Sequence, residues 1–152
     1  MTGRRYRWSV LAVAGALLVL IVPVTTSGLG IGIQTGMPIG GFLSIRDWIT
    51  PVLGLEAITY VSSSNGQLEG QVTGRLLAWG NRWQSGDLYV AGGVTYGFPE
   101  GNAALSAVAG VEFGLPISSS ITWNLEAGIS YRYEQGFSMA MSTGVHFYFS
   151  RP

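Results

Sequence analysis

The sequence predicts an all-β protein: an eight-stranded antiparallel up-and-down barrel that crosses a membrane. The first observation is an alternation over residues 121–133, in which Trp123 and Leu125 fall on one face and Glu126 and Arg132 on the other. Successive side chains of a strand point to opposite faces, so this segment has an apolar and a polar side. The second observation is that the same partition recurs in most later segments, as a barrel wall in a bilayer requires.

Composition is the third observation. The chain is 47% hydrophobic and only 11% charged, and it contains 23 glycines and no cysteine. This balance favours a membrane barrel over a soluble globule, and the absence of cysteine excludes disulfides and thiolate metal sites. After residue 27, five arginines stand against eight acidic residues. The mature chain is therefore mildly acidic, with no basic patch for nucleic acid.

Residues 1–27 have the order of a secretory signal peptide. A basic stretch, GRRYR, precedes the apolar run WSVLAVAGALLVLIV and the small, polar residues of PVTTSG. The alternative is an uncleaved membrane anchor, because the apolar run is long for a signal core and lacks an A-x-A site. We favour a cleaved signal, with cleavage after Thr26 or Ser27. Residues 28–152 then form one barrel domain.

Turn residues divide the rest of the chain into eight predicted strands, each near the length that a tilted strand needs to cross a bilayer. The strands cover residues 29–37, 42–49, 53–61, 68–79, 88–98, 105–115, 121–133 and 137–149. An even number of strands brings both chain ends to the same side, which is how single-chain bacterial barrels close.

Each break has its own turn chemistry. The first strand ends at Met-Pro-Ile-Gly-Gly, the second at Thr50-Pro51, the third at Ser-Ser-Ser-Asn-Gly and the fourth at GNRWQSGD. Pro-Glu-Gly-Asn follows the fifth strand, Pro-Ile-Ser-Ser-Ser precedes the seventh, and Gln135-Gly136 makes a tight reversal before the eighth. The second strand is the least regular, because Asp47 falls on its apolar face and indicates an early end, a bulge or an interfacial position.

The polar face is predicted to line the lumen. In a soluble barrel the apolar face would be inside, whereas here the apolar face is the continuous, bulky one. We expect the inward charges to form hydrogen-bonded pairs that plug the lumen, because the interior of eight strands is nearly filled by side chains. The predicted lumen network is Arg46, Glu56, Glu69, Arg75, Glu112, Glu126, Arg132 and His146.

Outward aromatic residues are predicted to form two girdles at the membrane interfaces. With the termini in the periplasm, the outer girdle is Tyr96, Phe98, Tyr131, Tyr133 and Phe137, and the inner girdle is Phe113, Trp123, Phe147 and Phe149. Trp48, Trp79 and Trp83, near the turns, are interpreted as interfacial anchors rather than as a ligand cage.

The segments GFLSIRDWITPVLGLEA, AGVEFGLPISSSITWNLEAGISYRY and GVHFYF resemble two hairpins and the closing strand of the small eight-stranded outer-membrane barrels of the OmpA, OmpX and OmpW type. The resemblance implies a bacterial outer-membrane location, and contact with lipid, periplasmic chaperones and the barrel assembly machinery. Phe147 and Phe149 match the alternating aromatics of the terminal assembly signal. Ser150, Arg151 and Pro152 depart from its final phenylalanine.

The preferred function is a structural role in envelope integrity, with a plugged lumen, and a narrow pore for ions or a small solute is the alternative. A lipid-modifying enzyme is disfavoured, because His146 is the one histidine and no serine stands in a His-x-Ser pair. We therefore expect no catalytic residues, cofactor or metal site. The stretch ALSAVAGVEF with Met139 and Met141 could form a homo-oligomer contact, which an ordinary lipid-facing surface explains equally well.

Overall fold

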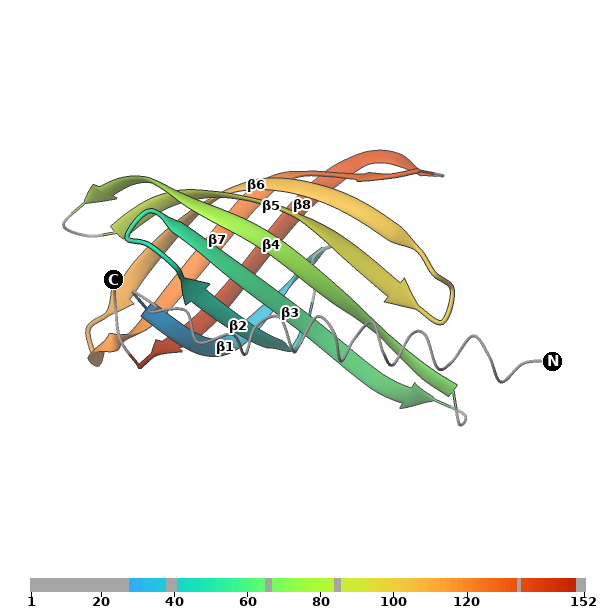
Figure 1. Cartoon of the computed structure of the whole chain (residues 1–152), viewed down its shortest axis with the longest axis horizontal. Helices are drawn as coiled ribbons and strands as arrows, with labels where there is room; N and C mark the ends of the chain where they lie inside the picture. The colour runs from blue at the N-terminus through green and yellow to red at the C-terminus, as the bar shows by residue number, and fades with distance from the viewer. Residues whose placement is uncertain (1–27, 38–40, 65–66, 84–85, 134, 150–152) are drawn as a thin grey trace.

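The computed structural model is a closed barrel of eight antiparallel strands in sequential order (Figure 1). It describes residues 28–37, 41–64, 67–83, 86–133 and 135–149. The strands are β1 (Gly28–Met37), β2 (Leu43–Trp48), β3 (Leu53–Ser64), β4 (Gln67–Trp83), β5 (Gly86–Phe98), β6 (Ala103–Leu115), β7 (Ser118–Arg132) and β8 (Gly136–Tyr148). The predicted up-and-down barrel is thus confirmed. The predicted signal segment lies outside the described residues.

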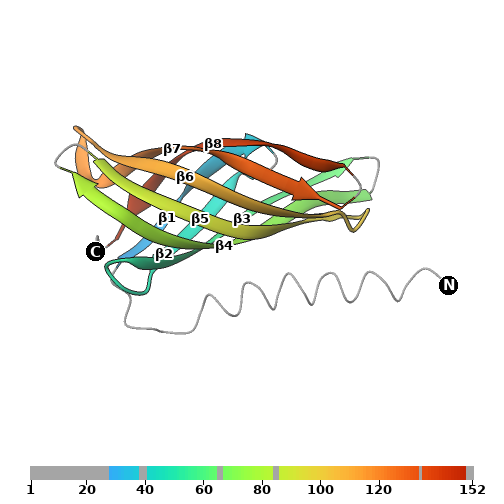
Figure 2. The same ribbon diagram turned by 90° about the horizontal axis from the view of Figure 1, so that it is seen from above.

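The barrel closes where β1 pairs with β8, in a register that runs from Gly30 opposite Tyr148 to Met37 opposite Met141. The start of β1 and the end of β8 therefore share one end, here called the terminus end. The β3–β4, β5–β6 and β7–β8 connections lie at the opposite, hairpin end. In two perpendicular views the strands run obliquely along an elongated barrel (Figure 2). Among the described residues, no helix is long and apolar enough to cross a membrane.

Several strands are longer than predicted. β4 continues through Gly80 to Trp83, because the register shifts between Trp79 and Asn81 and lets the strand pass a sequence predicted as a turn. β3 extends to Ser64, and its serine run pairs with β4 instead of forming a turn. β7 begins at Ser118, where the pairing with β6 is irregular: Ser118 lies opposite Leu115 after a register shift. Local turn propensity is outweighed at these places by pairing with the neighbouring strand.

β2 is the exception, with six residues where eight were predicted. Asp47 keeps regular register opposite Leu29 and Leu55, without a bulge, and the strand ends one residue later. Of the early end, the bulge and the interfacial position predicted for Asp47, the structure shows the early end and no bulge.

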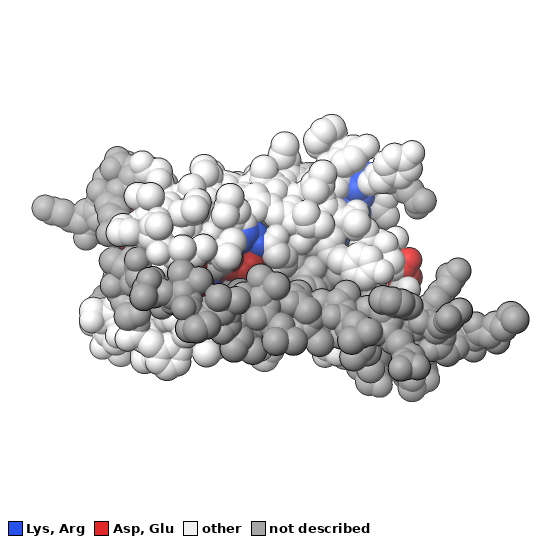
Figure 3. Space-filling model, viewed as in Figure 1, with Lys and Arg blue, Asp and Glu red and all other residues white. Residues whose placement is uncertain are grey.

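The partition between the two faces agrees with the prediction. Large apolar side chains are exposed on the outer wall, among them Ile33, Val90 and Met139, whose exposed fractions are 50%, 56% and 75%. Charged atoms are nearly absent from the outer face seen in Figure 3, apart from a small area near its middle and a few atoms near one end. The polar side chains of the same strands are buried inside. The molecule is therefore apolar outside, and its interior combines charged and polar side chains with a smaller set of buried apolar ones, such as Ile58 and Leu77.

Candidate functional site

The most concentrated chemistry lies inside the barrel, in the half nearer the terminus end. Six side chains, hereafter the lumen cluster, meet there from six different strands. All six are at most 4% exposed. They are Arg46 (β2), Glu56 (β3), Arg75 (β4), Glu112 (β6), Glu126 (β7) and His146 (β8). Each lies on the inward face predicted from the alternation, so the closed barrel brings together residues that are up to 100 positions apart.

Arg75 and Glu126 form a two-bonded ion pair in the lumen cluster. The Arg75 Nη1 and Nη2 atoms donate to the two carboxylate oxygens of Glu126, over 2.6 and 2.8 Å. Such a bidentate guanidinium–carboxylate pair is both strong and geometrically specific. Arg75 also donates to Glu56, from Nε over 2.9 Å and from Nη2. It thus joins β3 to β7 across the lumen.

Arg46 makes the second cross-link. Its Nε and Nη2 atoms donate to Glu56 Oε1 over 3.3 and 3.1 Å, and its Nη1 atom donates to Glu112. The guanidinium carbon also lies 5.3 Å from the centre of the Tyr89 ring, in a cation–π contact. The two arginines and three glutamates therefore form one connected network rather than separate pairs.

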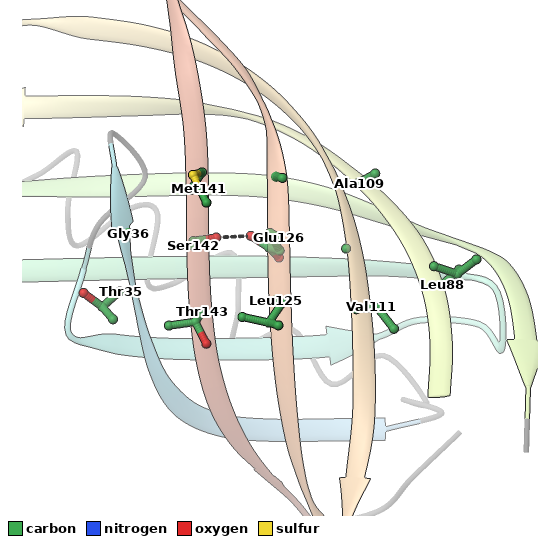
Figure 4. Close-up of a pocket in the computed structure, with 12 residues that line it drawn as sticks. Thr35, Gly36, Leu88, Ala109, Val111, Leu125, Glu126, Met141, Ser142 and Thr143 are labelled. Carbon is green, nitrogen blue, oxygen red and sulfur yellow. Dashed lines mark hydrogen bonds between the residues drawn. The ribbon is translucent and has the colours of Figure 1, made fainter. Parts of the chain in front are cut away.

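Neutral side chains fill the remaining hydrogen-bond positions of the carboxylates. Tyr89 donates its hydroxyl to Glu126 over 2.5 Å, and Ser142 donates to the other oxygen of Glu126. Ser44 donates to Glu56 over 2.7 Å. Figure 4 shows the Ser142–Glu126 bond joining β8 to β7. Burial of the carboxylates is offset by these bonds, as charges taken out of water require.

His146 of the lumen cluster contacts Ser44 and Glu56. Its Nε2 atom is 2.9 Å from Ser44 Oγ and 3.3 Å from Glu56 Oε1. A catalytic triad places the serine and the carboxylate on different ring nitrogens, whereas here both lie beside Nε2. Ser44 is itself fully buried. The contact is a lumen hydrogen bond, and it was not foreseen because Ser44 is 102 residues away in sequence.

Two predicted members of the network do not join it. Glu69 is exposed, and Arg132 is half-buried and donates to Gln135 over 3.1 Å. Both share the inward face of their strands but lie near the hairpin end, where Glu69 is opposite Ser62 and Arg132 is opposite Ala104 and Gly136. Alternation gives the face of a side chain; its height along the barrel depends on the strand register.

The prediction for Trp48 is wrong. Trp48 is fully buried inside the barrel, where its indole stacks on that of Trp79 with 4.3 Å between ring centres. It also donates Nε1–H to the Tyr148 hydroxyl over 3.3 Å. Trp48 shares the parity of Ser44 and Arg46, which is the signal that could have placed it inside. The half-buried Trp79 packs with it, and the side chain of Trp83 lies outside the described residues.

The predicted girdle residues lie on the outer wall and at its two ends. Tyr131 packs on Phe137 near the hairpin end, with 4.9 Å between ring centres. Near the terminus end, Phe113 stacks on Trp123 at 6.0 Å, and Phe147 meets Phe149 edge-on at 5.3 Å. Aromatic side chains therefore gather toward both rims of the apolar wall.

Each carboxylate of the lumen cluster is bonded to at least one guanidinium group. Within the described ranges, no group of three or more His, Cys, Asp or Glu side chains is arranged to hold a metal ion. Comparison with protein-family models, with curated proteins and with solved structures finds no match.

Proposed function

We propose that this protein is an integral barrel of the bacterial outer membrane with a sealed lumen, and that its role is structural, in the integrity of the cell envelope. The observation that carries the proposal is the distribution of apolar and charged side chains between the outer wall and the interior. Bulky apolar side chains cover the outside, and the buried interior holds charged pairs. Water is a poor solvent for such an outer wall, whereas a bilayer is a good one.

Closure of the sheet is the second support. Each strand is paired on both sides with its neighbours around the ring, so the barrel has no free edge strand. Backbone groups inside a bilayer need such internal partners, because lipid offers none. The paired aromatics near the two rims fit the positions at which aromatic rings stabilise a barrel at the membrane interfaces.

The filled lumen favours a structural role over a pore. The side chains of Arg46, Glu56, Arg75 and Glu126 cross the interior and are tied to one another on several sides. Opening a water path would require breaking several buried charged bonds at once, which is costly. We therefore expect no steady ion conduction through the wild-type barrel.

Planar bilayers test the sealed lumen directly. Purified wild-type protein inserted into a bilayer should give no stepwise conductance, whereas the double variant Arg75→Ala, Glu126→Ala should conduct. A heat-dependent gel shift checks that the variant is still folded. Stable, unitary conductance from the wild-type protein would contradict the sealed lumen.

The envelope role is tested in the producing bacterium. Deletion of the coding sequence should raise leakage of periplasmic proteins and sensitivity to detergent, and wild-type protein supplied in trans should restore both. An unchanged envelope in the deletion strain would count against the structural role, while leaving the sealed barrel to be judged by conductance.

A further inference from the structure

The charges of the lumen cluster do not balance. Two guanidinium groups, Arg46 and Arg75, face three carboxylates, Glu56, Glu112 and Glu126, all nearly inaccessible to water. One negative charge therefore remains in excess within the lumen cluster.

An uncompensated charge in a buried site costs several kcal/mol, and proteins commonly avoid this cost by binding a proton. The three carboxylates are poor carriers of such a proton, because each already accepts bonds from a guanidinium group. His146 is the remaining ionisable member of the lumen cluster. It is fully buried, and its Nε2 atom already lies beside Ser44 and Glu56.

The other ring nitrogen, His146 Nδ1, is buried and makes no hydrogen bond among the described residues. A proton there would lack a hydrogen-bond acceptor, but this cost is smaller than that of an uncompensated buried charge. The Ser44 hydroxyl donates to Glu56, so its oxygen is left to accept the hydrogen of His146 Nε2. Protonation at Nδ1 therefore breaks none of the existing bonds of the ring, and it places a positive charge 3.3 Å from Glu56.

The groups around His146 combine attraction and repulsion. β1 brings Gly30, Gly32 and Gln34 to this side of the lumen, none of which is ionisable. The imidazole contacts Glu56 of β3 and lies beside the Tyr148 ring of β8. The other buried ionisable groups of the lumen are Arg46 of β2, Arg75 of β4, Tyr89 of β5, Glu112 of β6 and Glu126 of β7. Asp87 of β5, half-buried opposite Glu112, lies outside the cluster. Three carboxylates outnumber two guanidinium groups, so a third cation makes the lumen cluster neutral.

We propose that the lumen is a proton-binding site, in which His146 is held as an imidazolium that serves as the third cation of the cluster. The bound proton makes the closed barrel sensitive to alkaline pH. In the unfolded chain, histidine is largely neutral above about pH 7.5. The folded barrel then binds one proton more than the unfolded chain, and its stability falls as pH rises.

The composition of the chain makes this proton easy to observe. The chain has no lysine and no cysteine, and His146 is its one histidine. Between about pH 7.5 and pH 9, the other ordinary side chains therefore change their charge little. The α-amino group does titrate in this range, but every variant carries it.

The first test is ¹⁵N NMR of the full mature barrel, refolded in detergent micelles and labelled at histidine. We expect an imidazolium spectrum at about pH 8, where a free histidine is neutral. A neutral imidazole at that pH would overturn the proposal. The measurement uses wild-type protein, so it does not depend on the folding of a variant.

The second test is the pH dependence of unfolding by urea. For wild-type protein the unfolding constant should rise about tenfold per pH unit between about pH 7.5 and pH 9. Glu112→Gln removes one carboxylate and leaves a side chain that can still accept from Arg46, so this dependence should vanish and His146 should become neutral at pH 8. Glu69→Gln, the same change at an exposed residue, should keep the wild-type slope. A wild-type slope in Glu112→Gln would refute the charge-balance argument.

Discussion

The charged side chains of the lumen both occupy the interior of the barrel and compensate one another's charge. Glu126 illustrates both, because it accepts bonds from Arg75, Tyr89 and Ser142. Loss of such a residue leaves its donors buried without an acceptor. Glu69 has the same parity but is exposed near the hairpin end, so its replacement should leave no buried donor without an acceptor.

The substitution Glu126→Ala should destabilise the barrel by about 3–5 kcal/mol, because it leaves Arg75 with one carboxylate partner fewer in a buried site. Urea titration of protein refolded in detergent micelles measures the effect. Glu69→Ala is the matched control, and it should change stability by about 0.5 kcal/mol or less. Equal effects of the two substitutions would show that the lumen cluster contributes little.

The sequence predicts that all six lumen-cluster side chains point inward, because side chains of a strand alternate every two residues whatever the neighbouring strands are. Alternation alone does not distinguish these six from Glu69 and Arg132, which share the inward face but lie outside the cluster. Height along a barrel is set by strand register and stagger, which are properties of pairs of strands. The sequence also predicts Trp48 as an anchor from its residue type, although its parity with Arg46 puts it inside.

At the scale of elements, strand positions were predicted well and strand ends less so. The serine run of residues 62–64 and the Gly80 sequence favour turns locally, yet pairing with a neighbouring strand extends β3 and β4 through them. A turn that needs a positive φ angle, by contrast, lies where the sequence predicts it. Gly136 has a φ of 76° in the tight connection before β8, where glycine is favoured over other residues.

The substitution Gly136→Ala should cost about 1–2 kcal/mol, because an L side chain is strained at positive φ. Gly74→Ala is the control. Gly74 lies in β4 with ordinary backbone, and an added Cβ would meet no atom within 4 Å. Its replacement should be neutral or slightly stabilising. Urea unfolding curves of the two variants give the comparison, and a larger loss for Gly74→Ala would contradict the assigned turn.

For the whole molecule, the membrane proposal depends on whether lipid or water surrounds the outer wall. Ala109, at the centre of β6, points outward between Val90 and Ala127, its register partners. Ala103 begins the same strand at the hairpin end, and both alanines are exposed. The two positions differ in the depth that they would have in a bilayer.

In a bilayer, Ala109→Arg should cost about 2–4 kcal/mol, whereas Ala103→Arg, near the interface, should cost about 0–1 kcal/mol. In water both exposed substitutions should have small effects. Folding free energies measured in lipid vesicles distinguish these cases. A similar, small cost at both positions would argue that the outer wall does not face lipid.

The most direct test of the membrane barrel is a combined fractionation and gel experiment on the protein in its own cells. We predict that the protein is recovered in the outer-membrane fraction, and that its gel mobility changes when the sample is boiled, because heat unfolds a closed, compact barrel. Recovery in the soluble fraction, with the same mobility before and after boiling, would contradict the account.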